Sequence, residues 1–272
     1  EPDSVKIDAY TITQPTCFGE DGTVEITATS GGDGGPYEYL VDTASASWQP
    51  GSTFSLPEGN YDIFARDGNL CVSDTLSVLI DAPTQVTHSV NITDATCNGA
   101  ADGAIEVTAA GGDGSYEFSI DGGPWTGITA NPHTFSGLTA GDYDIQVRDG
   151  SGCTSTVSTE TVSEPAPVTH SVVITDASCN GAADGTIEVT AAGGDGTYEF
   201  SIDGGPWTGI TANPHTFSGL TAGNYDIQVR DGNGCTSTVS TENVGQPTAV
   251  THSVIITDVT CNGDADGAIE VT

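Results

Sequence analysis

Cysteine is the residue type in this chain whose spacing points most clearly to chemistry. No two cysteines stand in a C-x-x-C arrangement, which argues against a zinc site. Two cysteines in each small repeating segment indicate disulfide bonds and an oxidising compartment. The seven cysteines occupy two recurring positions: Cys17, Cys97, Cys179 and Cys261 at the first, and Cys71, Cys153 and Cys235 at the second.

Two disulfide patterns fit this spacing. Pairing within segments joins Cys17–Cys71, Cys97–Cys153 and Cys179–Cys235, with the partner of Cys261 beyond Thr272, whereas pairing of neighbours joins Cys71–Cys97, Cys153–Cys179 and Cys235–Cys261. The first pattern requires the residues before Cys97 to be a lead-in to the fold. A full strand there would place Cys97 and Cys153 at opposite ends, about 26 Å apart. We expect the first pattern, with the folded core starting near Gly103.

Aspartates in glycine-rich turns are a second group with chemical potential. Turn carboxylates supply the hard oxygen ligands that calcium uses. No segment has the D-x-D-x-D-G pattern of a calcium loop, and aspartate is common in turns because its side chain bonds the local backbone. No cofactor is expected on this basis. Calcium is the one alternative left open, and its candidate ligands are Asp102, Asp149, Asp184 and Asp231.

Trp125 and Trp207 follow identical Asp-Gly-Gly-Pro turns and offer flat faces on which a sugar ring can stack. The competing interpretation is that each indole folds over the edge of a small core. Arg148, which Asp149 follows directly, is expected to form a structural ion pair, as is Arg230 in the next copy. No serine stands in a G-x-S-x-G motif, and we predict no catalytic residues.

The elements that position these residues recur with a fixed period. Residues 83–164 and 165–246 are near-identical copies, residues 1–82 form a divergent copy, and residues 247–272 match the start of a fourth. Such self-similarity is typical of architectures in which each copy folds as one unit. We predict three domains with these boundaries and a truncated fourth, and we interpret the chain as a piece of a longer array.

Alternation of apolar and polar residues predicts short strands within each copy. Residues 103–109, 116–121 and 143–148 alternate clearly, and glycine and proline interrupt the chain at strand-length intervals. Six or seven strands in about 80 residues predict an all-β fold of tandem immunoglobulin-like antiparallel β-sandwiches. Short linkers that contain proline favour an extended rod.

A tyrosine pattern supports the immunoglobulin-like prediction. In each copy a Leu-x-x-Gly-x-Tyr sequence leads into an alternating strand and ends at Tyr61, Tyr143 or Tyr225. This pattern resembles the tyrosine corner, in which the phenol bonds to upstream backbone. In antibody domains a cysteine follows this tyrosine by two residues. Here the cysteine comes later, so the antibody core disulfide is not expected.

The net charge excludes several classes of partner. The chain has 38 acidic and 4 basic residues, and its formal charge is −34. Nucleic acids and anionic membrane surfaces repel such a chain, and no apolar run approaches the roughly 20 residues that span a bilayer. We expect an extracellular, cell-surface location. The expected partners are neighbouring repeats, surface polysaccharide or copies of the same chain.

One stretch of each copy resembles a known family. Cys97-Asn-Gly-Ala-Ala-Asp-Gly-Ala-Ile-Glu-Val, followed by Gly-Gly-Asp-Gly-Ser-Tyr-Glu-Phe-Ser, resembles the SprB repeat of Bacteroidetes surface proteins. The first copy is the least typical, with Phe18 in place of the asparagine. The resemblance implies very large adhesins that the type IX system exports, some of which serve gliding motility. It also suggests O-glycosylation at Asp-Ser/Thr-apolar sites, here Ser4, Thr43 and Thr75.

These features predict structural stalk repeats of a large secreted adhesin or extracellular fibre, which provide reach, stiffness and multivalent attachment. Two alternatives stay open. One is a set of polysaccharide-binding modules that use the loops around Trp125 and Trp207, and the other is a subunit of a self-assembling filament or surface layer. An enzyme is not expected, because a stalk needs no duplicated active sites.

Overall fold

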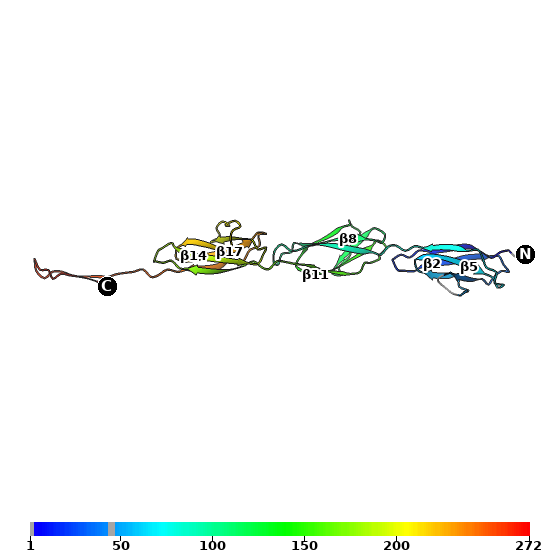
Figure 1. Cartoon of the computed structure of the whole chain (residues 1–272), viewed down its shortest axis with the longest axis horizontal. Helices are drawn as coiled ribbons and strands as arrows, with labels where there is room; N and C mark the ends of the chain where they lie inside the picture. The colour runs from blue at the N-terminus through cyan, green and yellow to red at the C-terminus, as the bar shows by residue number, and fades with distance from the viewer. Residues whose placement is uncertain (1–2, 43–46) are drawn as a thin grey trace. The chain divides into compact units, whose positions relative to one another are not determined.

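The computed structural model describes residues 3–42 and 47–272. Among these residues every regular element is a β-strand, and each of the three repeats contains six strands in two antiparallel three-stranded sheets. Figure 1 labels the central strand of each sheet. No helix in the described ranges has the length and apolar character needed to cross a membrane. The all-β prediction of tandem immunoglobulin-like sandwiches is confirmed.

The strand order is the same in the three repeats. The sheets are β1-β2-β4 and β3-β5-β6 in the first repeat, β7-β8-β10 and β9-β11-β12 in the second, and β13-β14-β16 and β15-β17-β18 in the third. The strands of the first repeat are β1 (Lys6–Thr13), β2 (Gly22–Ser30), β3 (Glu38–Val41), β4 (Thr53–Leu56), β5 (Gly59–Arg66) and β6 (Leu76–Ile80). Those of the second are β7 (Thr87–Thr93), β8 (Gly103–Ala110), β9 (Tyr116–Ile120), β10 (His133–Leu138), β11 (Gly141–Asp149) and β12 (Ser158–Val162). Those of the third are β13 (Thr169–Thr175), β14 (Gly185–Ala192), β15 (Tyr198–Ile202), β16 (His215–Leu220), β17 (Gly223–Asp231) and β18 (Ser240–Val244).

The second repeat begins with a full strand. β7 pairs with β8 along its whole length, from Thr87 opposite Ala110 to Thr93 opposite Ala104. Val90, on the inner face of β7, packs against the buried cluster of the repeat. The prediction that these residues are a lead-in, with the folded core starting near residue 103, is therefore wrong.

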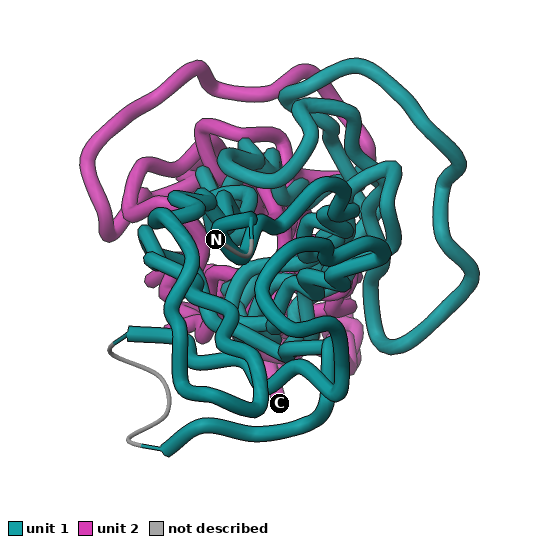
Figure 2. The backbone as a smooth tube through the Cα atoms, turned by 90° about the vertical axis from the view of Figure 1, so that its right-hand side faces the viewer, with its two compact units in different colours: residues 1–94, 101–163 teal, residues 95–100, 164–272 magenta. Residues whose placement is uncertain are grey.

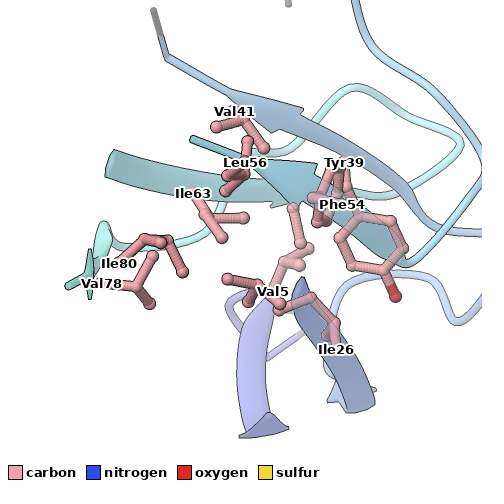
Figure 3. Close-up of a cluster of buried hydrophobic side chains, with 11 residues drawn as sticks. Val5, Ile26, Tyr39, Val41, Phe54, Leu56, Ile63, Val78 and Ile80 are labelled. Carbon is pink, nitrogen blue, oxygen red and sulfur yellow. The ribbon is translucent and has the colours of Figure 1, made fainter. Parts of the chain in front are cut away.

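Each sandwich closes around the alternating residues of its two sheets. In the second repeat Ile105 and Val107 of β8, Phe118 of β9 and Ile145 of β11 are completely buried. Every second residue of a strand faces the same side, so these positions all reach the space between the sheets. Figure 3 shows the corresponding cluster of the first repeat, in which labelled side chains from both sheets lie close together.

Tyrosine hydroxyl groups bond backbone carbonyls at two places in each sandwich. The predicted corner tyrosines donate to the residue four positions upstream: Tyr61 to Pro57 at 3.1 Å, Tyr143 to Thr139 at 2.8 Å and Tyr225 to Thr221 at 2.9 Å. A second set, which the sequence did not single out, donates from Tyr37 to Gly31, from Tyr116 to Gly111 and from Tyr198 to Gly193. Both sets tie a loop to the sheet beside it.

The contacts of the chain divide it into two compact units, which Figure 2 distinguishes by colour. One unit contains residues 1–94 and 101–163, and the other contains residues 95–100 and 164–272. The short segment 95–100 follows β7 of the second repeat. Nevertheless, it belongs to the unit that contains the third repeat.

The last residues form a hairpin of β19 (Val254–Thr257) and β20 (Ala268–Val271). Ile269 corresponds to a completely buried residue of the second repeat, but it is 71% exposed here. Within the described residues, this hairpin therefore lacks the opposing sheet that covers its apolar face in the complete repeats.

Candidate functional site

The loop after β7 is held by the chain that follows β12. The N–H of Ser163 donates to Asp94 Oδ1 at 2.8 Å, which places the end of β7 beside the end of β12. Further along the same loop, Asn98 Nδ2 donates to Glu164 Oε1 at 2.7 Å and the N–H of Gly99 donates to the other oxygen of that carboxylate. This loop carries the first cysteine of the repeat.

The third repeat has the same arrangement without a disulfide. The N–H of Gly181 donates to Gln246 Oε1 at 2.7 Å, and Asn180 Nδ2 donates to the carbonyl of Pro247 at 3.3 Å. Cys179 in this loop is an exposed free thiol. Hydrogen bonds to the chain around residues 246 and 247, and not a disulfide, therefore set the geometry of the loop.

The second cysteine of each repeat follows a buried aspartate. Asp149 is only 1% exposed, and its Oδ1 accepts the N–H groups of Ser151 at 3.1 Å and Cys153 at 2.9 Å. Its Oδ2 accepts the N–H of Asp113 at 3.2 Å. Gly112 has φ of +60° and approaches so closely that a Cβ atom there would collide with this carboxylate. The carboxylate thus determines the shape of the cysteine turn.

Equivalent turns form at Asp67 and Asp231, which accept the corresponding backbone N–H groups. The N–H of Cys71 holds the pKa of Asp67 below its usual value. Hydrogen bonds from the hydroxyl and the N–H of Ser115 lower the pKa of Asp113 to about 2. Because hydrogen bonds to the ionised form favour it, Asp67 and Asp113 keep negative charge at the end of the sandwich that carries the second cysteine.

The two cysteines of one repeat lie at opposite ends of the sandwich. β7 is seven residues long and spans about 23 Å. Cys97 follows the end of β7, whereas the turn before Cys153 contacts Asp113, just beyond the far end of β8. A disulfide requires Cα atoms within about 7 Å. The predicted pairs Cys17–Cys71, Cys97–Cys153 and Cys179–Cys235 are therefore wrong.

The observed disulfides cross the repeat boundaries in a pattern that neither hypothesis contained. Cys17 bonds Cys153 and Cys97 bonds Cys235, with Cα–Cα distances of 5.5 and 5.6 Å. In both bonds the first cysteine of one repeat joins the second cysteine of the next. This also excludes the neighbour pattern, in which the second cysteine of one repeat joins the first of the next. Each bond lies within one of the two compact units.

The disulfide of the first boundary is integrated into the second sandwich. Cys17 packs against the buried cluster that contains Val86 and Cys153, and the carbonyl oxygen of Thr16 lies 3.3 Å from the sulfur of Cys153. Three cysteines of the described residues form no disulfide and are exposed: Cys71, Cys179 and Cys261.

The predicted calcium ligands do not assemble into a metal site. The carboxylates of Asp149 and Asp231 already accept backbone N–H groups, and Asp184 accepts both the hydroxyl and the N–H of Ser178. Asp102 is the fourth candidate. In residues 3–42 and 47–272, no three His, Cys, Asp or Glu side chains are placed to hold a metal ion.

Each predicted sugar platform carries an arginine on one face. The guanidinium of Arg148 lies 4.6 Å from the ring centre of Trp125, and that of Arg230 lies 4.5 Å from Trp207. The same pair forms in the first repeat between Arg66 and Trp48, which the sequence did not single out. A stacked cation stabilises the indole and leaves a sugar only the other face.

The ion-pair partner of each arginine is a cross-strand glutamate. Arg148 pairs with Glu117 and Arg230 pairs with Glu199. Arg148 of β11 lies directly opposite Glu117 of β9 in the sheet register. The expected structural ion pairs of Arg148 and Arg230 are therefore present. The aspartate that follows Arg148 faces the other side of the strand.

His88 of β7 joins the two sheets of the second repeat. Its Nδ1 lies 3.0 Å from Ser155 Oγ and its Nε2 lies 2.7 Å from Ser158 Oγ. Burial lowers the pKa of His88, and the smaller effect of the Glu160 charge opposes this shift. His170 occupies the same position in the third repeat, and burial lowers its pKa as well.

These histidines predict a loss of stability in mild acid. The imidazole pKa in the unfolded chain is about 6.5, so the unfolded state binds the proton first as the pH falls. The histidine contribution to stability is present above about pH 6.5 and is lost below it. We expect the melting temperature, measured by circular dichroism, to fall between pH 7.5 and 5.5, and the fall to be smaller in a His88→Gln, His170→Gln double variant. Replacement of the exposed His252 by Gln should leave the decrease in melting temperature unchanged. The same decrease in the double variant as in the unmodified chain would show that His88 and His170 do not cause it.

The suggested glycosylation sites lie on the surface where they are described. Ser4 and Thr75 are exposed. Thr43 lies outside the described residues. Exposure is necessary for modification, and modification at these sites stays a prediction.

The chain is similar to several solved structures at low sequence identity. A three-domain fragment of titin is 11% identical, with 90% of this chain and 99% of that chain covered and a TM-score of 0.42. The first eight immunoglobulin domains of Down syndrome cell adhesion molecule are 13% identical, with 88% and 36% covered and a TM-score of 0.41. FdeC, an Escherichia coli adhesin, is 13% identical, with 90% and 99% covered and a TM-score of 0.33.

The sequence comparison gives a more specific result. No curated protein matches the chain. The SprB repeat matches residues 9–46, 89–124, 171–206 and 253–272, so every copy contains one match. In the second copy the matched segment contains most of β7, the Cys97 loop, β8 and β9. These four matches support the SprB-repeat family for this chain.

Proposed function

We propose that this chain is a stalk segment of a large secreted cell-surface adhesin or extracellular fibre, in which the repeats provide reach and stiffness. The observation that carries the proposal is that each disulfide crosses a repeat boundary. At such a boundary a load acts on two covalent connections, the linker and the disulfide. Neighbouring sandwiches are therefore held together even where the contacts between them are weak.

Other features agree with this role. Disulfide bonds are characteristic of oxidising, extracellular compartments, and the high negative charge keeps a long chain soluble. SprB repeats and immunoglobulin-like sandwiches are typically structural modules without catalytic activity. Export by the type IX system and a role in gliding motility are further proposals, which follow from the family resemblance.

Disulfides that cross repeat boundaries could continue along a longer array of repeats. Cys71 and Cys179 are exposed thiols at the positions that form disulfides at the other boundaries. Their turns already have the bonded geometry, because Asp67 orders the first and Gln246 contacts the second. We propose that repeats on either side would supply the missing partners.

An in-phase deletion tests the stalk role. Removal of residues 83–164 from the parent protein brings Cys17 of the first repeat into register with Cys235 of the third, so a boundary disulfide can still form. We expect the shortened protein to reach the cell surface and to bind its target at a shorter distance from the cell, as measured by electron microscopy. Loss of target binding by a normally displayed deletion protein would overturn the proposal.

A binding assay separates the stalk from its alternatives. Purified residues 1–272 should bind no polysaccharide on a glycan array and should remain single chains in electron micrographs. Binding that disappears in Trp125→Ala and Trp207→Ala variants would replace the stalk with a polysaccharide-binding role. Regular filaments would replace it with self-assembly.

A further inference from the structure

The two disulfides enclose overlapping parts of the chain. The first joins residues 17 and 153, and the second joins residues 97 and 235. Residues 97–153 therefore lie inside both enclosed segments. Disulfides confined to single repeats, or to adjacent cysteines along the chain, would have no such overlap.

The overlap gives three separate covalent routes between the two disulfides. One route runs through residues 18–96, the second through residues 98–152 and the third through residues 154–234. The first contains most of the first sandwich and β7, the second contains β8 to β11, and the third contains β12 to β17. All three must be broken before the two disulfides separate.

We propose that this connectivity makes the chain tolerant of backbone cleavage, so that it stays in one covalent piece after one cut between residues 18 and 234, and after two cuts on different routes. This property goes beyond the proposed stalk function, because it depends only on the disulfide pattern. It suits an exposed extracellular chain, where a single proteolytic cut would otherwise release everything beyond it.

The sandwiches expose segments that a protease can reach. The long loop between β9 and β10 includes Ile128, which is 68% exposed, and the equivalent loop of the third repeat includes Ile210, which is 67% exposed. In the first repeat the segment before β6 exposes Asp74 and Thr75. Such loops are the preferred sites of proteolytic cleavage. One loop lies on each of the three routes.

Cleavage sites on the three routes provide the test. We would insert the recognition sequence of a site-specific protease between residues 74 and 75, 127 and 128, or 209 and 210, singly and in combination. After cleavage of the folded chain, free thiols are alkylated to prevent disulfide exchange. The products are then separated in detergent without reductant. Circular dichroism before cleavage shows that each variant is folded.

We expect every single cut and every pair of cuts to leave one full-length species. The triple cut should give two species, one with residues 1–74 and 128–209 and the other with residues 75–127 and 210–272. Pairing within repeats would instead release residues 1–74 after the first cut alone. Pairing of neighbouring cysteines would split the chain after the second cut alone, and either result would overturn the proposal.

Two variants test whether the cleavage result depends on the overlapping disulfides. Cys17→Ser should make the cut at residue 74 release the first 74 residues, whereas Cys71→Ser should change nothing.

Light digestion of the unmodified chain by a protease of broad specificity gives an independent test. It should nick the exposed loops while the non-reduced product keeps its full mass, and early release of fragments from residues 18–234 would contradict the proposal.

Discussion

Reduction of the two disulfides is expected to lengthen the fully stretched chain from about 400 Å to about 950 Å, at roughly 3.5 Å per residue. In the oxidised chain the shortest covalent path between the termini uses only residues 1–17, 97–153 and 235–272. The other residues lie on parallel routes that carry no load once this path is taut. Unfolding under force therefore releases less than half of the chain.

Single-molecule force spectroscopy with handles at both termini measures this length directly. Cys71→Ser is the matched control, because Cys71 forms no disulfide and its replacement should leave the oxidised length unchanged. If the cysteines were paired within repeats, Cys71→Ser would add about 190 Å, the length of the released loop. That gain, or equal lengths before and after reduction, would contradict the disulfides Cys17–Cys153 and Cys97–Cys235.

Asp149→Ala is expected to destabilise the second repeat by about 3 kcal/mol. The substitution removes a buried carboxylate and leaves three backbone N–H groups without their acceptor, those of Ser151, Cys153 and Asp113. A buried donor that is left without its charged acceptor costs more folding free energy than the loss of an ordinary hydrogen bond. The turn that presents Cys153 also loses its support, so the disulfide to Cys17 should form more slowly.

Asp149→Asn should destabilise the second repeat by about half as much. Its amide oxygen can still accept two of the N–H groups, while its NH₂ faces the third donor. Asp142→Ala is the matched control on the same strand. Asp142 is exposed and accepts the hydroxyl of Thr161, so we expect a change of about 0.5 kcal/mol or less.

Denaturant unfolding followed by tryptophan fluorescence measures these effects. Each repeat contains one tryptophan, so a background with Trp48→Phe and Trp207→Phe reports on the second repeat through Trp125. An Asp149→Ala variant within 0.5 kcal/mol of its background would show that the buried carboxylate does not determine the turn.

The fold was predictable because its signals are local. Alternation around Ile105 and Val107 correctly predicted a strand with one buried face. β7 shows the same alternation through Val90 and Ile92, which are only partly buried. The error there came from the assumed disulfide, which required this strand to be a lead-in, and not from the pattern of residues.

The disulfide pattern depends on which end of the sandwich each cysteine occupies. Once β7 is accepted as a full strand, the first cysteine lies where the chain leaves the repeat and the second lies where it enters. The first cysteine of one repeat is then close to the second cysteine of the next. The sequence contained this signal, but it requires the strand register and not only the spacing of the cysteines.

The partners of Arg148 show a different limit of prediction from sequence. Glu117 is distant along the chain and becomes its neighbour through the register of β9 and β11. Trp125 reaches the same guanidinium from the loop that follows β9. The sequence alone predicted an ion pair, but its partner depends on the register of two strands that are distant along the chain.

Mass spectrometry of non-reduced peptides tests the boundary disulfides most directly. The chain has only four basic residues, so cleavage at aspartate or with pepsin, after alkylation of free thiols, gives suitable peptides. We predict linked peptides that join Cys17 to Cys153 and Cys97 to Cys235, with Cys71 alkylated. A peptide that joins Cys97 to Cys153, or Cys71 to Cys97, would contradict the account.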